Sequence, residues 1–209
     1  MPMLIDDRHL PAMLTTGPMT DDQFLELCIE HEDLRFELTA DGELIIQPVP
    51  FNLTARREEK LYKQLDTWAE ADGRGYASGS NQWFTLPSGA RRVPDAVWVL
   101  KSRVAELPPE TLDKYWPLCP DFVAEVRSKS DRLPVLRAKM EEWIANGAQL
   151  GWLIDPERRA VEVYRTGAGA VILESPDSVC ADAPPIGDSA ASIFFRLDLQ
   201  PIWEPLAGR

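Results

Sequence analysis

Short apolar segments with the character of β-strands alternate along this chain with two longer segments that have the spacing of amphipathic α-helices. The longer helix is predicted over residues 52–72 and ends at Gly73, and the second is predicted over residues 132–146, after Asp131, and ends at Gly147. The alternation does not form a long series of βαβ units. We therefore expect an α/β protein with one mixed central β-sheet flanked by α-helices.

A further helix is predicted from Thr20, which precedes Gln23 at the spacing of a capping box. Turn residues divide the predicted strands from one another. The predicted strands form a hairpin over residues 34–47 and single strands over residues 75–86, 93–100, 121–127, 151–155 and 161–165.

Length and composition favour a single folded domain over residues 1–209. Its core is predicted over about residues 19–174, and residues 175–209 are expected to form a C-terminal loop and tail that pack on that core. The loop is predicted over residues 175–189, which are rich in Pro and Asp.

The charge of the chain limits its partners. The sequence has 22 Lys and Arg against 34 Asp and Glu, a formal net charge of −12. An acidic surface argues against nonspecific binding to polyanions or to anionic membranes unless basic groups gather at one place. No segment is long and apolar enough for a membrane span.

The few histidines and cysteines exclude several kinds of site. The two histidines lie in the first sixth of the chain, and the three cysteines lack the CxxC spacing of a zinc site or a disulfide framework. The start of the chain has early charged residues and does not have the pattern of a signal peptide. We therefore expect a cytoplasmic protein whose chemistry depends on carboxylates, basic residues and a bound cation.

Two carboxylates lie inside apolar segments, Asp95 in RRVPDAVWV and Glu125 in DFVAEVR. Burial of a lone carboxylate costs several kcal/mol, so each needs a partner. Mg²⁺ suits both, because it prefers oxygen ligands and keeps bound waters that can take part in hydrolysis. The sequence therefore predicts a metal site at Asp95 and Glu125.

Basic residues gather around these two carboxylates. From residue 125 to residue 139 the chain has five basic and two acidic residues, although the whole chain is acidic. Lys139 borders the apolar stripe of its predicted helix and can reach inward. A cation that orients water and neutralises a phosphate in the transition state can come from Arg127, Lys129 or Lys139. The structural alternative is that Glu125–Arg127 and Asp95–Arg92 are ion pairs at strand ends and that Lys139 extends along the surface to solvent.

The order of these segments resembles the Uma-type restriction-endonuclease family of the PD-(D/E)xK nuclease superfamily. The resemblance rests on VPD, on AEVRS about thirty residues later, on the helix with Lys139 and on NGAQLGWLIDPERRAVEVYR. It covers residues 19–165 and extends more weakly to residue 198. It implies a restriction-endonuclease-like core, a Mg²⁺ or Mn²⁺ site and phosphodiester hydrolysis.

The resemblance also implies roles for single residues. Asp95 matches the aspartate of the superfamily's PD motif and Glu125 its (D/E), and the backbone carbonyl of Val126 is a further candidate metal ligand. Arg127 stands where the superfamily has its lysine, and in this family the following helix supplies that lysine, here Lys139. Glu37 matches the acidic residue of the family's first strand.

We therefore expect a metal-dependent endonuclease that acts on DNA and forms a homodimer, with candidate catalytic residues Asp95, Glu125, Lys139, Glu37 and Arg127. RNA and small phosphodiesters stay open as substrates. The alternative is a catalytically inactive binding or assembly module with the same fold. In that case the C-terminal aromatic run, which includes Phe194, Phe195 and Trp203, is expected to form the docking surface.

Overall fold

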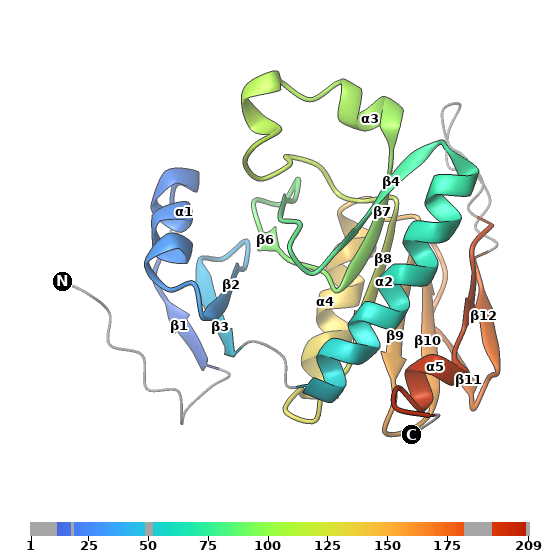
Figure 1. The fold of residues 1–209 in the computed structure, drawn as a ribbon. Helices are drawn as coiled ribbons and strands as arrows, with labels where there is room; N and C mark the ends of the chain where they lie inside the picture. The colour runs from blue at the N-terminus through green and yellow to red at the C-terminus, as the bar shows by residue number, and fades with distance from the viewer. Residues whose placement is uncertain (1–11, 18, 49–51, 182–193, 208–209) are drawn as a thin grey trace.

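The computed structural model describes residues 12–17, 19–48, 52–181 and 194–207. Its largest sheet has six strands in the order β11-β10-β9-β8-β7-β4 (Figure 1). The pair β8–β9 is parallel and the other neighbours are antiparallel, so the sheet is mixed as predicted. Its strands are β4 (Gly75–Gly79), β7 (Ala96–Leu100), β8 (Phe122–Val126), β9 (Leu150–Asp155), β10 (Ala160–Arg165) and β11 (Val171–Glu174).

Two helices cover opposite faces of this sheet (Figure 1). Helix α2 (Asn52–Asp72) packs Leu61 and Leu65 into one buried cluster. Helix α4 (Leu133–Ala145) packs Met140 and Trp143 into the other. The predicted α/β fold with a mixed central sheet and flanking helices is confirmed.

The N-terminal part of the chain forms a second sheet that the sequence did not predict as a separate unit. Its order is β1-β3-β2-β6-β5, and helix α1 (Asp21–Glu30), capped by Thr20 as predicted, packs on it through Phe24. The strands are β1 (Ala12–Thr15), β2 (Leu34–Leu38), β3 (Glu43–Pro48), β5 (Phe84–Thr85) and β6 (Arg91–Arg92). The hairpin predicted over residues 34–47 is the β2–β3 pair of this sheet.

Pro94 explains why there are two sheets. The predicted strand over residues 93–100 begins only at Ala96, and the two residues before Val93 form β6 in the other sheet. Proline has no N–H to donate and disfavours regular pairing at its position. The chain therefore passes from one sheet to the other at Val93–Asp95.

The predicted strand over residues 75–86 is also interrupted. It ends at Gly79, and the N–H groups of Asn81 and Gln82 both donate to the Gly79 carbonyl oxygen, which makes a tight turn before β5. Gly, Ser and Asn favour such turns. This turn forms one wall of the pocket described below.

The C-terminal segment belongs to the core on the side of α2. Strand β12 (Ser178–Cys180) pairs with β13 (Arg196–Asp198), and α5 (Gln200–Trp203) follows. The loop predicted over residues 175–189 is therefore wrong at β12, because Val179 is buried with Leu197 in the core, and its residues 182–189 lie outside the described residues. The single-domain organisation of residues 1–209 stays a prediction.

The proposed docking surface of the C-terminal aromatic residues is not formed. Phe195 and Trp203 are only 2% and 8% exposed and pack among core residues, whereas Phe194 is 69% exposed.

Two short helical turns, α3 (Lys101–Ala105) and η2 (Pro109–Thr111), lie between β7 and β8.

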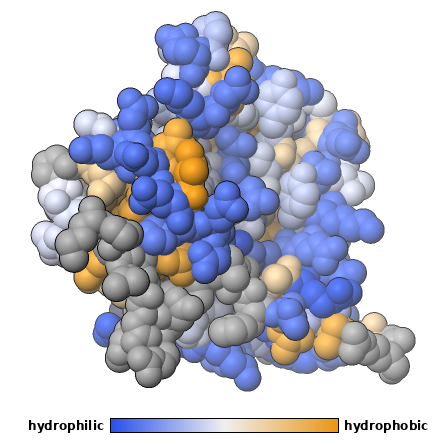
Figure 2. Space-filling model, turned by 60° about the vertical axis from the view of Figure 1, so that its left-hand side comes forward, coloured by the Kyte–Doolittle hydropathy of each residue, from blue (hydrophilic) through white to orange (hydrophobic). Residues whose placement is uncertain are grey.

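The face seen in Figure 2 carries mainly hydrophilic side chains with separate hydrophobic spots, in agreement with the high content of charged residues. Within the described residues, no helix has both the length and the hydropathy that a membrane crossing requires.

Candidate active site

Asp95 lies in the short connection between the two sheets, one residue before β7. Its Oδ2 atom accepts a hydrogen bond of 2.7 Å from the N–H of Val126 at the end of β8. In a β-strand the N–H and C=O of one residue point to the same side. The Val126 carbonyl therefore faces the side on which Asp95 lies, where the resemblance expects a metal ligand.

Glu125 is buried on the face of β8 that packs against α4, with 3% of its surface exposed. Its Oε1 atom accepts a hydrogen bond from the indole N–H of Trp143 at 3.1 Å. The ammonium of Lys139, one turn earlier on α4, lies 2.8 Å from the same oxygen.

Lys139 brings the predicted site residues together. Its Nζ atom contacts Glu125 on β8 and lies 2.8 Å from Glu37 on β2, and it donates to the Val93 carbonyl oxygen at 3.1 Å. The side chain is only 10% exposed. The interpretation of Lys139 as a solvent-directed surface residue is therefore wrong.

Glu37 is held by two cations and one backbone group. Besides Lys139, it contacts Arg92 at 3.1 Å and accepts the N–H of Val93 at 3.0 Å. Arg92 also binds Glu142 of α4 at 2.5 Å. Within the described residues, the predicted Asp95–Arg92 ion pair does not form, because Arg92 points to these two glutamates instead.

The carboxylates of the site differ in how their surroundings shift their pKa values. Burial acts to raise the pKa of Glu37, but Lys139 and Arg92 hold it below its ordinary value. Burial raises the pKa of Asp95 from 3.8 to about 7, with a contribution from Glu58. Burial also raises the pKa of Glu125 from 4.5 to about 8, and the neighbouring Asp95 and Glu37 add to this although Lys139 opposes it.

Lys139 stays protonated in this setting. Burial acts to lower its pKa, but Glu125, Glu37 and Asp95 together raise it above its ordinary value. Its single ammonium is shared by several carboxylates, and at Glu125 burial outweighs the contact with Lys139, so the pKa of Glu125 is raised.

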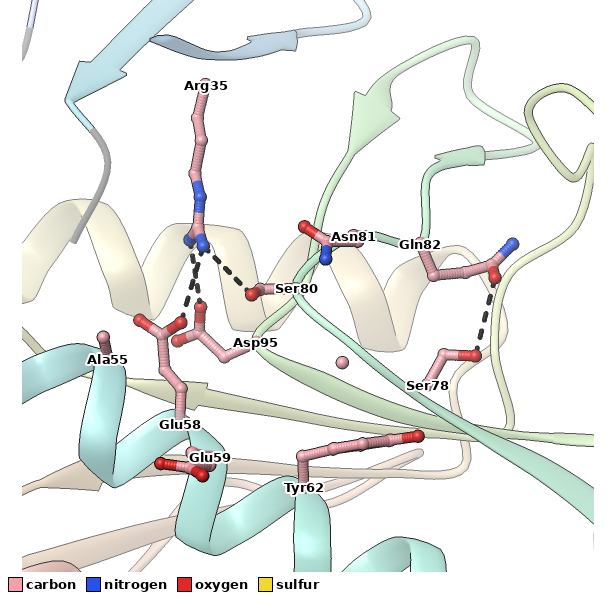
Figure 3. A pocket seen from close by; sticks show the side chains of 11 residues that line it. Arg35, Ala55, Glu58, Glu59, Tyr62, Ser78, Ser80, Asn81, Gln82 and Asp95 are labelled. Atoms are coloured by element: carbon pink, nitrogen blue, oxygen red, sulfur yellow. Dashed lines mark hydrogen bonds and ion pairs between the residues drawn. The ribbon is translucent and has the colours of Figure 1, made fainter. Parts of the chain in front are cut away.

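Arg35 and Glu58 also belong to the site and were not predicted. Arg35 on β2 lies 3.5 Å from Glu58 of α2 and 3.8 Å from Asp95 (Figure 3). Glu58 precedes Leu61 and Leu65 at helical spacing and shares their buried stripe, where a carboxylate is unusual. Arg35 is two residues from Glu37 on the same strand, hence on the same face of it. Both signals were present in the sequence.

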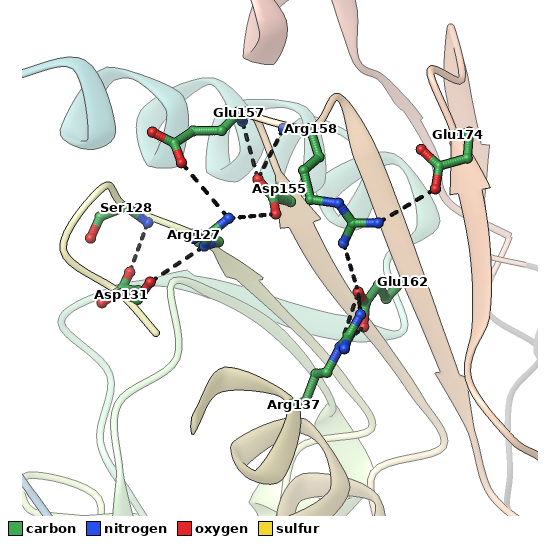
Figure 4. Close-up of polar contacts among 9 residues, drawn as sticks. All are labelled: Arg127, Ser128, Asp131, Arg137, Asp155, Glu157, Arg158, Glu162 and Glu174. Carbon is green, nitrogen blue, oxygen red and sulfur yellow. Dashed lines mark hydrogen bonds and ion pairs between the residues drawn. The ribbon is translucent and has the colours of Figure 1, made fainter. Parts of the chain in front are cut away.

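The structure does not bring Arg127 to Lys139. Its guanidinium lies 2.8 Å from Asp155 and 3.8 Å from Glu157, and it contacts the backbone oxygen of Asp131 at 3.4 Å (Figure 4). The predicted Glu125–Arg127 ion pair is therefore not formed within the described residues. Arg127 fixes the connection between β8 and α4.

Lys129 lies exposed in the same connection. The loop is closed by the Ser128 N–H, which donates to Asp131 at 2.7 Å. Asp131 thus makes a turn before α4, and the helix begins at Leu133, one residue later than predicted.

The donor set at Asp95 and Glu125 fits a hard divalent cation. Both are carboxylates whose pKa values are raised chiefly by burial, with a further contribution from neighbouring carboxylates. In the part of the chain that the structure describes, no three His, Cys, Asp or Glu side chains form a group that could hold a metal by themselves. Mg²⁺ is commonly held by one or two carboxylates, with waters and substrate phosphate completing its shell.

Comparison with known proteins gives the family and the fold of this chain. A protein-family model, Uma2, described as "Putative restriction endonuclease", matches residues 21–186. The chain belongs to the Uma2 family. No curated protein matches it.

The fold of this Uma2 protein is also found in a solved structure. The crystal structure of "a putative nuclease belonging to DUF820" from Anabaena variabilis is similar with a TM-score of 0.68. The sequences are 22% identical, and the match covers 90% of this chain and 98% of the other. At that identity the similarity shows the fold.

Proposed function

We propose that the protein is a metal-dependent endonuclease that hydrolyses phosphodiester bonds, with DNA as its substrate. One observation supports this most directly: the buried ammonium of Lys139 lies 2.8 Å from Glu125 and interacts electrostatically with Asp95. The family's description as restriction endonucleases supports the same assignment.

Asp95 and Glu125 would hold Mg²⁺ or Mn²⁺ together with the Val126 carbonyl oxygen. The bound cation would polarise the scissile phosphate and lower the pKa of a water. Lys139 would orient the attacking water and offset charge that develops on the phosphate. Glu37 acts on Lys139, as a positioning residue that holds the ammonium at the site.

Arg127 does not belong to the reacting groups in this proposal. Its ion pair with the fully buried Asp155 gives it the role of fixing the β8–α4 connection. Lys129 is exposed in that connection, and its ammonium would bind a phosphate of the nucleic-acid backbone.

The proposal includes a homodimer. Strand β11 is the edge of the central sheet, and its residues Val171 and Ile172 are 51% and 44% exposed. An apolar edge strand is a surface that a second copy can cover by strand pairing.

The test is cleavage of plasmid and oligonucleotide DNA with Mg²⁺ or Mn²⁺, with EDTA as the metal-free control. Asp95→Asn and Glu125→Gln are each expected to slow cleavage by roughly a hundredfold or more, the size typical of losing one strong electrostatic contact in a transition state. Asp113→Asn, which changes an exposed carboxylate, is the matched control and should keep full activity.

A second pair of variants tests which lysine acts in the reaction. Lys139→Met should abolish cleavage at a temperature where it is folded, whereas Lys129→Met should change the rate only a few-fold. Calorimetric titration with Mn²⁺ separates activity from metal binding. A wild-type protein that is folded, binds no Mn²⁺ with or without DNA and cleaves nothing would favour the inactive binding module instead.

A further inference from the structure

A pocket of about 620 Å³ opens next to Asp95, between α2 and the turn that follows β4 (Figure 3). The ionic cluster of Arg35, Glu58 and Asp95 forms one end of it. The other end has no role in the metal site and needs a separate explanation.

That other end carries an aromatic ring and two amides. Tyr62 of α2 lies along the floor of the pocket, and Asn81 and Gln82 project from the turn on its far side (Figure 3). The Ser78 hydroxyl donates a long hydrogen bond of 3.5 Å to the side-chain oxygen Oε1 of Gln82. Among the described residues, the side-chain nitrogen Nε2 of Gln82 has no hydrogen-bond partner.

Gly79 keeps the space next to the ring open. A Cβ atom at this position would lie 3.5 Å from Cγ of Tyr62, and a larger side chain would extend into the pocket. The gap beside the ring therefore depends on a residue without a side chain.

The charges of the lining favour a neutral occupant. Three lining residues are carboxylates, Glu58, Glu59 and Asp95, and Arg35 is the one lining residue with a basic side chain among those described. Arg35 already contacts Glu58 and Asp95. A phosphate would be repelled deep in this pocket, whereas a nucleobase is neutral and has both a stacking face and hydrogen-bonding edges.

We propose that this pocket binds one unpaired base of a nucleic-acid strand, stacked on Tyr62 and contacted at its edge by the amides of Asn81 and Gln82. The inference rests on the proposed function, because it places the adjacent phosphate at the Asp95 end. A base in a continuous duplex is stacked and paired and cannot enter a pocket without leaving the helix. The preferred substrate class is therefore single-stranded nucleic acid, or duplex with unpaired nucleotides.

The test measures binding without cleavage. Fluorescence anisotropy in EDTA compares a labelled single-stranded decanucleotide with the same sequence in a blunt duplex. The wild type should bind the single strand at least about tenfold more tightly. Tyr62→Ala should lose about tenfold or more of the single-strand affinity, the range found for one base stacked on an aromatic ring.

Two further variants test whether a loss of binding in Tyr62→Ala comes from the pocket itself. Tyr76→Ala removes a tyrosine from β4 that does not line the pocket, and should leave the affinity unchanged. Gly79→Val fills the space beside Tyr62 without removing any polar group, and should weaken single-strand binding as Tyr62→Ala does.

The outcomes separate this inference from the proposed function. Equal or tighter binding of the blunt duplex, or no loss in Tyr62→Ala and Gly79→Val, overturns the base pocket even if the protein cleaves DNA with Mn²⁺. Pocket-dependent binding of the single strand without any cleavage supports the base pocket and contradicts the endonuclease assignment.

Discussion

Lys139 has an unusual place for a helical lysine. Its ammonium is buried among Glu37, Glu125 and the Val93 carbonyl oxygen, and it offsets carboxylates from two different sheets. A buried charge that loses its partner is costly, so this one side chain affects stability as well as chemistry.

Lys139→Met is therefore expected to lower the free energy of unfolding by about 3–5 kcal/mol, the usual cost of breaking a buried ion pair from one side. Urea unfolding of the variant and the wild type measures this difference in the free energy of unfolding. Lys114→Met, which removes an exposed ammonium 3.7 Å from Asp22, should stay within about 0.5 kcal/mol of the wild type. Equal effects of the two substitutions would contradict the buried-charge account.

The raised pKa of Asp95 predicts how the stability of the folded protein changes with pH. Its pKa is raised in the folded state, so the folded protein holds this proton more tightly than the unfolded chain. The contribution to stability is complete below pH 3.8 and is lost as the pH rises through about 7. Without metal, the protein should become less stable over that range.

Asp95→Asn keeps an oxygen for the Val126 N–H but removes the charge. In EDTA it should raise the Tm at about pH 8.5 more than at about pH 5, by several degrees, since 1 kcal/mol corresponds to roughly 2–4 °C in a chain of this size. Thermal melts of wild type, Asp95→Asn and Asp113→Asn at both pH values measure this. A gain that is the same at both pH values would show that the Asp95 charge is not destabilising.

At the scale of single residues, the sequence predicted part of the candidate site. A carboxylate inside an apolar segment was sufficient to select Asp95 and Glu125 as candidates. The pattern of basic residues left Arg127, Lys129 and Lys139 open, and the family resemblance pointed to Lys139. Arg35 and Glu58 were missed because both lie in segments rich in charged residues, which is the pattern of a solvent-exposed surface. Which partner a charged side chain meets depends on packing between distant segments, and local patterns do not contain it.

At the scale of elements, β4 shows how two glycines of one strand differ. A Cβ at Gly75 would lie 2.2 Å from Cε2 of Trp98, far inside contact distance, whereas one at Gly79 would make ordinary contacts from 3.5 Å. The Trp98 ring is fully buried and packs against Trp68, so it has little room to shift.

Gly75→Ala is therefore expected to destabilise the protein by roughly 3 kcal/mol, at the upper end of overpacking costs. Gly79→Ala in the same strand should be nearly neutral. Chemical unfolding of the two variants side by side gives the comparison. If Gly75→Ala were as stable as Gly79→Ala, the close packing of β4 on Trp98 would be wrong.

The main helices and five of the six strands of the central sheet were predictable because their apolar spacing is regular, whereas edge strand β11 was not predicted. The division into two sheets was not, although Pro94 marks the boundary. A proline shows that pairing is interrupted, but not which sheet receives the strand on either side of it. The same limit applies to the turn after Gly79.

At the scale of the whole molecule, the edge of the central sheet is the place where the proposed homodimer is tested. Light scattering of the wild type should give about twice the chain mass of 23.5 kDa. Ile172→Lys puts a charge on edge strand β11 and should give the monomer.

Ile29→Lys is the matched control, because Ile29 is 62% exposed on α1, away from that edge. It should stay dimeric. A wild type that scatters as a monomer at all concentrations, or a dimer that Ile172→Lys leaves intact, would rule out pairing through β11.

The ion pairs of Lys139 also set an order of events during synthesis. Glu37 leaves the ribosome early, but its partner on α4 is translated only after both sheets have been started. Folding of a domain waits for such late segments. Under the proposed function, the nascent chain has no complete site until α4 has been translated, so the contacts between Lys139 and the two sheets also delay nuclease activity until most of the chain has been made.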